Sequence, residues 1–424
     1  MRASALTPMR LGGHVKGADM ACDARGFNQE RLAEVQALFE GHFGAIGSDA
    51  RVLVANAPGR SEISGNHTDH EGGHVIAGAL DVSVLAIAVP NGTNTVRVID
   101  AAFPPFEVTL DALEPRPEER VSSPAIVRGM AAALAETGRT PAGFDLASMS
   151  NIPAGGGLSS SAAVEALYGR VMEALWEGPE VSAVELAKMG QRTENLYFGK
   201  PCGLMDQLAV CLGGLAFMNF EDAARPQTAK LDFDFDAAGY ALVLVDVGCD
   251  HAPFTDDYAA VPVEMQAVAK EFGHERLCEV APDQFRARLP EVREKLGDRA
   301  LVRAIHYWYE NSLVDRRWDA LQAADIDTFL KLTCESGASS GMFLQNVSSG
   351  GSFQPAMAAL GMAEHILAGR GAIRIHGGGF GGSIQCFVPL DILDEFMAQM
   401  DAWLGEGACR HYHIAEEGAH AAWR

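Results

Sequence analysis

The sequence predicts an α+β protein of two domains, and three observations carry that prediction. The chain has 424 residues, more than a single hydrophobic core usually serves. Its strand-like and helix-like segments follow one another without the regular βαβα cadence of a doubly wound parallel sheet. A polar stretch without a long period, residues 221–237, divides the chain. We therefore expect one domain over residues 1–236 and a second over residues 237–424.

The elements of the first domain follow from local patterns. Residues 1–25 show no clear period and are expected to form an irregular lead-in, whereas residues 28–44 carry apolar side chains at helical spacing before a glycine. Three runs rich in β-branched residues predict strands, at 51–57, 82–89 and 95–100. The remaining expected elements are a strand in 143–153 and helices at 124–138, 161–178 and 181–199.

The second domain is expected to be richer in helix. An apolar strand at 240–248 opens it, and two strands joined by a glycine turn over 371–390 stand near its end. Helical spacing between them predicts three helices, at 256–273, 300–325 and 353–369.

Composition limits the possible partners. Apolar residues make up 48% of the chain and charged residues 21%, an ordinary globular balance, but the net charge is −23. Such a surface repels nucleic acid and anionic membranes, so a polyanionic substrate needs a local device such as a metal ion or oriented backbone amides. The eight cysteines include no CxxC pair, which argues against zinc and disulfide frameworks and suits a reducing cytoplasm. The apolar run at 82–89 is too short to cross a bilayer. We expect a cytoplasmic protein.

The stretch "NIPAGGGLSSSAAVEAL", Asn151–Leu167, is the clearest chemical signal. Three glycines allow close approach of the backbone to a ligand, and three serines stand where a helix begins. The free N–H groups and the positive dipole end of that helix form a cradle for phosphate. The loop lacks the GK[ST] of a Walker A motif, and an ordinary capped connection remains the alternative. The predicted nucleotide-binding residues are Gly155, Gly156, Gly157, Leu158, Ser159, Ser160 and Ser161.

Two further motifs are weaker in isolation. "GGGFGGS", Gly377–Ser383, reads either as a flexible hairpin or as a backbone wall pressed against a ligand, with Phe380 as an apolar plug. "CGLMDQLA" places Asp206 among apolar neighbours at the start of a predicted helix, either as a first-turn aspartate or as a general base. Glu194, on the preceding helix, is a candidate metal ligand.

A fourth stretch, "GRSEISGNHTDHEGG", narrows the interpretation when the motifs are taken together. It resembles the galactokinase signature G-R-x-N-x-I-G-E-H-T-D-Y-N-x-G. The Gly/Ser loop, "CGLMDQ" and "GGGFGGS" resemble the second motif, catalytic segment and third motif of the GHMP kinases, and "AEEGAHA" resembles their terminal strand. The resemblance is to the galactokinase branch of that superfamily. It implies a ribosomal-S5-like N-terminal domain and a ferredoxin-like C-terminal domain, with the site between them.

The resemblance also implies a mechanism. Asp206 would take the proton of a sugar's anomeric hydroxyl, which then attacks the γ-phosphate of ATP, and Arg60 would keep Asp206 ionised and neutralise developing charge. Ser161 and Glu194 would hold Mg²⁺. The partners expected are ATP and a hexose, with neither nucleic acid nor membrane, in a monomer or weak homodimer. The predicted substrate-binding residues are Asn66, His67, Thr68, Asp69, Gly203 and Tyr258.

Departures from the family pattern leave the sugar open. Asn66 stands where galactokinases have Glu, at a position implied to face the C6 hydroxyl, and an amide can donate to a uronate carboxylate that a second carboxylate would repel. Glu62, Ser64, His70 and Ser383 also depart from the pattern, and the arginine run expected after Tyr258 is replaced by "AAVPVEM". Galactose, galacturonate and N-acetylgalactosamine are therefore all candidate acceptors. A non-catalytic galactose and ATP sensor is the alternative from another class, although the intact "SSSAA" argues against it.

Overall fold

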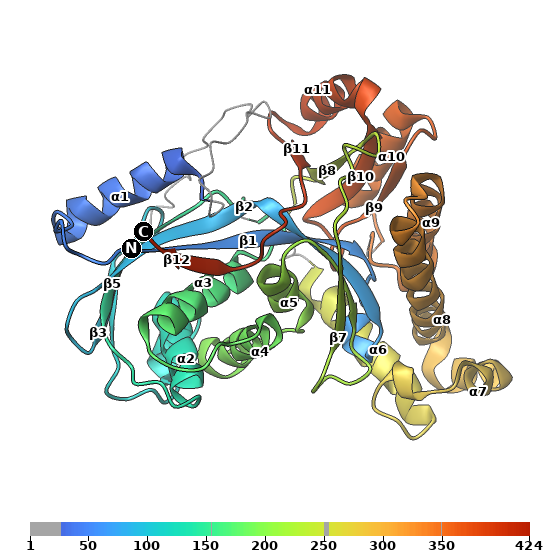
Figure 1. Cartoon of the computed structure of the whole chain (residues 1–424). Coiled ribbons are helices and arrows are strands. Elements are labelled where there is room, and N and C mark those ends of the chain that lie inside the picture. The colour runs from blue at the N-terminus through green and yellow to red at the C-terminus, as the bar shows by residue number, and fades with distance from the viewer. Residues whose placement is uncertain (1–26, 154, 250–253, 349) are drawn as a thin grey trace, which may run out of the picture.

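The structure is a computed structural model that describes residues 27–153, 155–249, 254–348 and 350–424, so the expected lead-in at 1–25 lies outside the described residues (Figure 1). Within those residues the chain forms one sheet of eight strands and one of four. The larger sheet contains β1 (Leu53–Ser64), β2 (His74–Pro90), β3 (Thr95–Asp100), β4 (Phe106–Thr109), β5 (Phe144–Ser150), β6 (Leu215–Asn219), β7 (Gln227–Leu231) and β12 (His420–Trp423).

The two long strands β1 and β2 organise the larger sheet. The main order is β12-β1-β2-β5-β3-β4, and β2 divides its neighbours, since residues 84–90 pair with β5 and residues 74–78 pair with β6. The β3–β5 pair is parallel, and the other pairings are antiparallel. β1 runs through the polar residues up to Ser64, with irregularities at Pro58/Arg60 and Glu62/Ser64. Arg60 and Glu62 therefore lie on a strand, and residues 65–73 alone form the connection.

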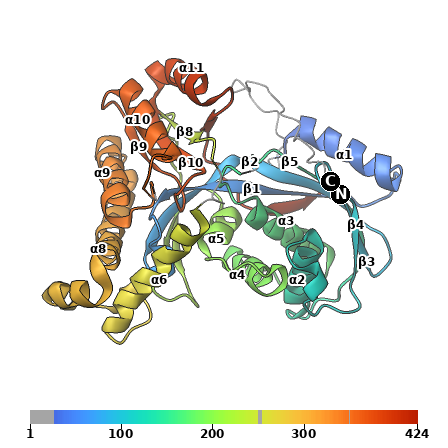
Figure 2. The ribbon, with the colours of Figure 1, turned by 180° about the vertical axis from the view of Figure 1, so that it is seen from behind.

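Helices cover both faces of this sheet (Figures 1 and 2). α1 (Gln29–Phe43) buries Leu32, Val35 and Phe39 against β1, β2 and β5 on one face. On the other face, α3 (Ser160–Leu175) and α5 (Met205–Leu212) pack on β1 and β2, with α2 (Ser123–Ala135) and α4 (Ala183–Thr193) behind them. This second face carries the glycine loop and Asp206, because α3 and α5 begin there.

The smaller sheet contains β8 (Tyr240–Asp246), β9 (Ala372–Ile375), β10 (Ser383–Pro389) and β11 (Cys409–Tyr412), in the antiparallel order β11-β8-β10-β9. Across the sheet, the strands are the fourth, first, third and second of the domain in chain order. This is the arrangement of a ferredoxin-like βαββαβ unit. α10 (Pro355–Leu367) and α11 (Leu393–Leu404) pack on it through an apolar cluster of their own. The expected ferredoxin-like C-terminal architecture is therefore confirmed.

Four helices connect the two sheets: α6 (Thr255–Glu271), α7 (Pro282–Ala287), α8 (Leu289–Gln322) and α9 (Ile326–Ser339). α8 packs against α6, α9 and β2, and α9 packs against β9. Arg317 of α8 is fully buried and donates to the carbonyl of Ile63 and the hydroxyl of Ser64 on β1. These bonds join the helical connection to the strand that carries Arg60.

The helices and strands expected from periodicity are present, including those at 28–44, 124–138, 256–273 and 371–390. The strand expected at 51–57 is longer than predicted, because pairing with β2 extends β1 to Ser64. β7 lies inside the stretch 221–237, where no strand was expected. The boundary at residue 236 stays a prediction, and β12 brings the last residues back to β1, pairing Leu53 with Trp423. No helix within the described ranges combines the length and apolarity that a membrane span requires.

Candidate active site

The side chains of Arg60 and Asp206 meet where β1 passes the start of α5. Arg60 Nε lies 2.7 Å from Asp206 Oδ1, and the guanidinium also donates to the carbonyl of Gly157. The Arg60 side chain is 8% exposed, whereas that of Asp206 is 35% exposed. The pair is thus anchored on the arginine side and open on the carboxylate side. The structure brings together two residues that the sequence separates by 146 positions.

The ionisation of Asp206 is set by its neighbours. Burial acts to raise the pKa of this carboxyl, but the charge of Arg60 and hydrogen bonds from Arg60 and Ser159 outweigh it and hold the pKa below its usual value. Its place in the first turn of α5 favours the same charged form. Asp206 is therefore a carboxylate at neutral pH, able to accept a proton but held by two donors.

The glycine–serine loop lies next to this pair. Gly155, Gly157 and Ser159 adopt positive φ angles of 78°, 68° and 55°, and α3 begins at Ser160. A methyl group added at Gly155 would meet no atom within 4 Å, so the space in front of it is open. The Ser159 hydroxyl donates to Asp206 Oδ2, while the carbonyl of Leu158 accepts from the backbone of Arg60. The proposed phosphate cradle and the Arg60–Asp206 pair therefore form one continuous surface.

Four residues predicted to bind substrate gather beside Asp206. The His67 ring lies 5.2 Å from that of Tyr258 and 5.7 Å from that of His70, measured between centroids. A Cβ atom at Gly203 would come within 2.9 Å of Asp69 Oδ2, so the absence of a side chain there lets the backbone pass the carboxylate. Burial, and then the charges of Asp69 and Asp206, raises the pKa of Tyr258. His67, Asp69, Gly203 and Tyr258 thus converge from three separate segments.

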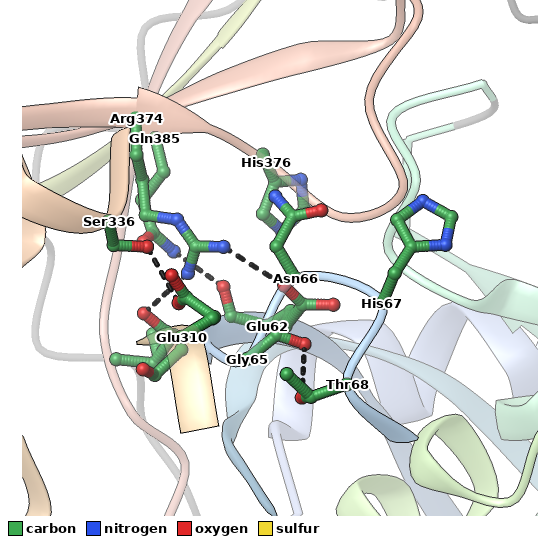
Figure 3. Close-up of polar contacts among 12 residues, drawn as sticks. Glu62, Gly65, Asn66, His67, Thr68, Glu310, Ser336, Arg374, His376 and Gln385 are labelled. Atoms are coloured by element: carbon green, nitrogen blue, oxygen red, sulfur yellow. Dashed lines mark hydrogen bonds and ion pairs between the residues drawn. The ribbon is translucent and has the colours of Figure 1, made fainter. Parts of the chain in front are cut away.

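Asn66 and Thr68 are placed differently from their neighbours, since both are fully buried. The Asn66 Oδ1 atom accepts from Asn346 Nδ2 at 2.7 Å, and its own Nδ2 has no hydrogen-bond partner. The Thr68 hydroxyl lies 2.9 Å from the carbonyl oxygen of Gly65 and 2.6 Å from that of His74 (Figure 3). Thr68 therefore closes the loop from inside, and the Asn66 side chain keeps its Nδ2 donors unused.

A buried polar cluster supports this loop from below. Glu62 Oε1 lies 3.1 Å from Arg374 Nη2, and Arg374 also donates to the carbonyl of Ile63. Figure 3 shows Glu62, Arg374 and Glu310 on one side of Asn66 and His67 on the other. Burial raises the pKa of Glu62 to about 7, although Arg374 opposes the shift. Near neutral pH the Glu62 carboxyl is therefore divided between its protonated and ionised forms.

The third glycine motif packs against both the predicted substrate-binding residues and the buried side chains around Asn66. Phe380 is 2% exposed and packs near Phe254, as the expected apolar plug. The carbonyl of Gly378 lies 2.9 Å from His67 Nε2, and a Cβ atom at Gly378 would collide with the ring of Tyr258. The motif is therefore a backbone wall around the predicted sugar residues. Sequence reasoning missed Asn346, which has no motif around it, and His376, which directly precedes the third glycine motif and lies 3.0 Å from Ser61 Oγ. It also missed the Ser159–Asp206 contact, for which only the serine-rich loop was a signal.

The two predicted metal ligands, Ser161 and Glu194, differ in exposure. Ser161 is exposed in the first turn of α3, whereas Glu194 is 3% exposed and accepts from Gln207 Nε2 at 3.0 Å. The same nitrogen lies 3.1 Å from Glu165 Oε2, and Gln207 Oε1 and Glu165 Oε1 have no hydrogen-bond partner. Burial and the charge of Glu194 raise the pKa of Glu165. The side-chain oxygens of Glu165, Glu194 and Gln207 are hard ligands, and two of them have no hydrogen-bond partner, so this group of residues fits a Mg²⁺ ion.

Two family models match the chain at these segments. Residues 125–214, which hold the glycine–serine loop and Asp206, match the GHMP kinases N-terminal domain. This segment of the chain is therefore similar to the GHMP kinases. Residues 37–90, which hold Arg60 and the loop after β1, match the galactokinase galactose-binding signature. These matches confirm the resemblance to the galactokinase branch that the motifs predicted.

Solved structures of GHMP kinases share the fold. The chain superimposes with a TM-score of 0.77 on Lactococcus lactis galactokinase complexed with galactose, at 24% identity, covering 92% of this chain and 99% of that one. Mevalonate kinase of Methanococcus jannaschii gives 0.60 at 13% identity, over 85% and 98% of the two chains. A heptose 1-phosphate kinase from Bacteroides thetaiotaomicron gives 0.60 at 14% identity, over 87% and 98%. The mixed α and β fold of GHMP kinases expected from the motifs is confirmed, and the division into two domains stays a prediction.

Proposed function

We propose that this protein is an ATP-dependent sugar-1-kinase that transfers the γ-phosphate of ATP to the anomeric hydroxyl of galactose or a close relative. The observation that carries the proposal is the Arg60–Asp206 pair, 2.7 Å apart and open on the carboxylate side, beside the glycine–serine loop. The match to the galactokinase galactose-binding signature supports a galactose-like acceptor.

Each residue group has a distinct part in this reaction. Asp206 accepts the proton of the attacking hydroxyl, and Arg60 keeps it ionised and offsets the negative charge that develops on the phosphoryl group. The backbone amides from Gly155 to Ser161 bind the phosphates, which explains how a chain with a net charge of −23 holds a nucleotide. Ser161 and Glu194 would hold Mg²⁺, which would neutralise phosphate charge when bound. His67, Asp69, Gly203 and Tyr258 form the acceptor side of the site.

Release of ADP on mixing with Mg-ATP and a free sugar tests the proposal. We expect turnover with galactose or a relative, and stoichiometric binding without ADP release would assign the chain to the sensor class instead. The Arg60→Met variant is a matched control for contaminating ATPase, because it should lose the sugar-dependent release while any contaminant activity persists.

Galacturonate remains a second acceptor because of the state of Asn66. The Asn66 Oδ1 atom already accepts from Asn346 Nδ2, whereas the Asn66 Nδ2 atom has no hydrogen-bond partner and keeps both of its donors. A donor suits a carboxylate, whereas a glutamate in that place would repel one. A turnover comparison of galactose, galacturonate and N-acetylgalactosamine with wild type and Asn66→Glu tests this. We expect Asn66→Glu to lower the ratio of galacturonate to galactose turnover, and an unchanged ratio would contradict the role of Asn66.

A further inference from the structure

A cluster of two histidines and two aspartates lies outside the site described above. Asp236 precedes β8, His411 is on β11, and His413 follows β11 where the chain leaves the smaller sheet. One potential ligand atom from each of these three residues lies within 4.8 Å of the other two. The fourth member, Asp81, belongs to β2 of the larger sheet. The cluster therefore stands at the junction of the two sheets.

The backbone fixes the two histidines on one side. Residues two apart on a strand point to the same face, and the rings of His411 and His413 lie 4.4 Å apart between centroids. Tyr412, between them, is 5% exposed and belongs to the core. β11 pairs with β8 through His411 and Val243, so this presentation does not depend on a flexible loop.

Two of the separations are close to those between ligands of a tetrahedral ion. His411 Nε2 lies 3.0 Å from Asp236 Oδ1, and His413 Nε2 lies 3.4 Å from Asp236 Oδ2. Zinc bonds to nitrogen and oxygen of about 2.0–2.1 Å place two ligands of a tetrahedron about 3.3 Å apart. The separations from Asp236 to each imidazole nitrogen bracket that value. A small central cation is therefore compatible with the side chains as they stand.

Asp81 supplies the feature that distinguishes this cluster from a casual ion pair. It lies 3.0 Å from His413 Nδ1, and its other oxygen accepts from the backbone N–H of His413 at 3.2 Å. A metal-bound histidine commonly donates its second ring nitrogen to a carboxylate, which fixes the tautomer and the ring orientation. With Nδ1 protonated toward Asp81, the lone pair of Nε2 faces Asp236. The imidazolium form donates from both ring nitrogens, to Asp81 and to Asp236, and a metal ion bound between Nε2 and Asp236 would take the place of the second ring proton.

We propose that His411, His413 and Asp236 form a binding site for a divalent transition-metal ion of the zinc class, with Asp81 orienting His413. Imidazole and carboxylate ligands suit zinc and its neighbours in the first transition row, and a water molecule would complete the coordination. The ion ties the segment before β8 to β11 and, through Asp81, to β2. Its role is structural, since it links the two sheets away from Arg60 and Asp206. The scattered cysteines gave no sign of it, because none of the ligands is a cysteine.

Titration of the metal-free, tag-free protein with Zn²⁺ in excess Mg²⁺, without sugar or nucleotide, tests this site. We expect one equivalent to bind, with the dissociation constant raised at least about 100-fold in His411→Asn and in Asp236→Asn, and about 10- to 100-fold in Asp81→Asn. His365→Asn, at an exposed histidine of α10, is the matched control and should bind as wild type does. Far-ultraviolet circular dichroism of each variant reports that it is folded.

Co²⁺ provides a second readout of the same ligands. Its visible spectrum in wild type should show the bands of a four- or five-coordinate nitrogen and oxygen site without a thiolate charge-transfer band. The melting temperature of wild type, but not of His411→Asn, should rise with one equivalent of Zn²⁺. Failure of wild type to bind one equivalent, or unchanged binding in both His411→Asn and Asp236→Asn, would overturn the proposal. None of these readouts depends on whether the chain phosphorylates a sugar.

Discussion

Arg60 Nε lies 2.7 Å from Asp206 Oδ1, and this contact joins strand β1 to the first turn of helix α5. Burial acts to raise the pKa of Asp206, and the charge and hydrogen bond of Arg60, with the hydrogen bond of Ser159, outweigh it. Replacing Arg60 by Met should therefore raise the Asp206 pKa and move the acid limb of kcat/KM to higher pH, because the protonated carboxyl cannot act as a base. Wild type should show no such limb near neutral pH. We also expect kcat to fall by about 10²-fold or more, since the phosphoryl group loses a positive charge.

The pH profile of Arg60→Lys is the control for charge against geometry. Lysine keeps the positive charge but cannot donate to Asp206 and Gly157 at once as the guanidinium does. The acid limb of the Arg60→Lys profile should therefore stay near that of wild type, while kcat falls. An Arg60→Met profile with the wild-type acid limb would show that Arg60 does not set the ionisation of Asp206.

Ser159 should act on the rate through Asp206 rather than through the nucleotide. Its hydroxyl donates to Asp206 Oδ2, so Ser159→Ala removes one of the hydrogen bonds that orient and ionise the carboxylate. A hydrogen bond to a charged group contributes about 1.5 kcal/mol, so kcat should fall about tenfold with little change in KM for ATP. Steady-state kinetics of Ser159→Ala and Ser160→Ala separates the two roles. A rise in KM for ATP without loss of kcat in Ser159→Ala would contradict the assignment.

The glycine loop offers a matched pair of substitutions. At Gly155 a Cβ atom meets no protein atom but enters the open space where phosphates are proposed, and φ is 78°. At Gly156 a Cβ atom faces Pro153 at 3.6 Å, an ordinary contact. Gly155→Ala should raise KM for ATP more than about tenfold and lower the unfolding free energy by about 1 kcal/mol, whereas Gly156→Ala should change both little. Equal effects of the two substitutions on KM for ATP would argue against phosphate binding at Gly155.

Glu62 should make stability depend on pH. Burial raises its pKa to about 7 in the folded chain, above the value near 4.3 of an unfolded chain. Between these values the folded state holds one more proton than the unfolded state, so stability falls as pH rises, by up to about 1.4 kcal/mol per pH unit. Glu62→Gln should remove that part of the slope in denaturant unfolding measured from pH 5 to 7. Glu71→Gln should remove a separate part, because burial raises the Glu71 pKa to about 8. An unchanged slope in Glu62→Gln would show that Glu62 is ionised throughout.

Sequence reasoning succeeded where local patterns carry the information. Helical periodicity and terminal glycines located α1, α2 and α6, and positive φ at Gly155 and Gly157 agrees with the predicted close-approach loop. The family motifs named both Arg60 and Asp206, which no local pattern would have paired. The extent of β1 was not predictable, because its polar residues pair with β2 and are buried by segments that follow more than 200 residues later.

The surroundings of Asn66 show a second limit. Asn66 departs from the galactokinase signature, but its local sequence does not reveal its hydrogen-bond partners. Asn346 donates to its side-chain oxygen, and His306 Nε2 lies 3.1 Å from its backbone carbonyl oxygen. Both partners come from the helical connection of the second half, as does Arg317 beneath β1. Which atoms of Asn66 remain free is therefore a property of tertiary packing.

The most direct test of the account is a phosphorus NMR endpoint with Mg-ATP and free galactose, comparing wild type with Asp206→Asn. Wild type should convert the γ-phosphate of ATP into a sugar 1-phosphate, and Asp206→Asn should form it at least about 10²-fold more slowly while still binding nucleotide. Unimpaired transfer by Asp206→Asn, or phosphate on a carbon other than the anomeric one, would contradict the assignment of Asp206 as the base in a sugar-1-kinase.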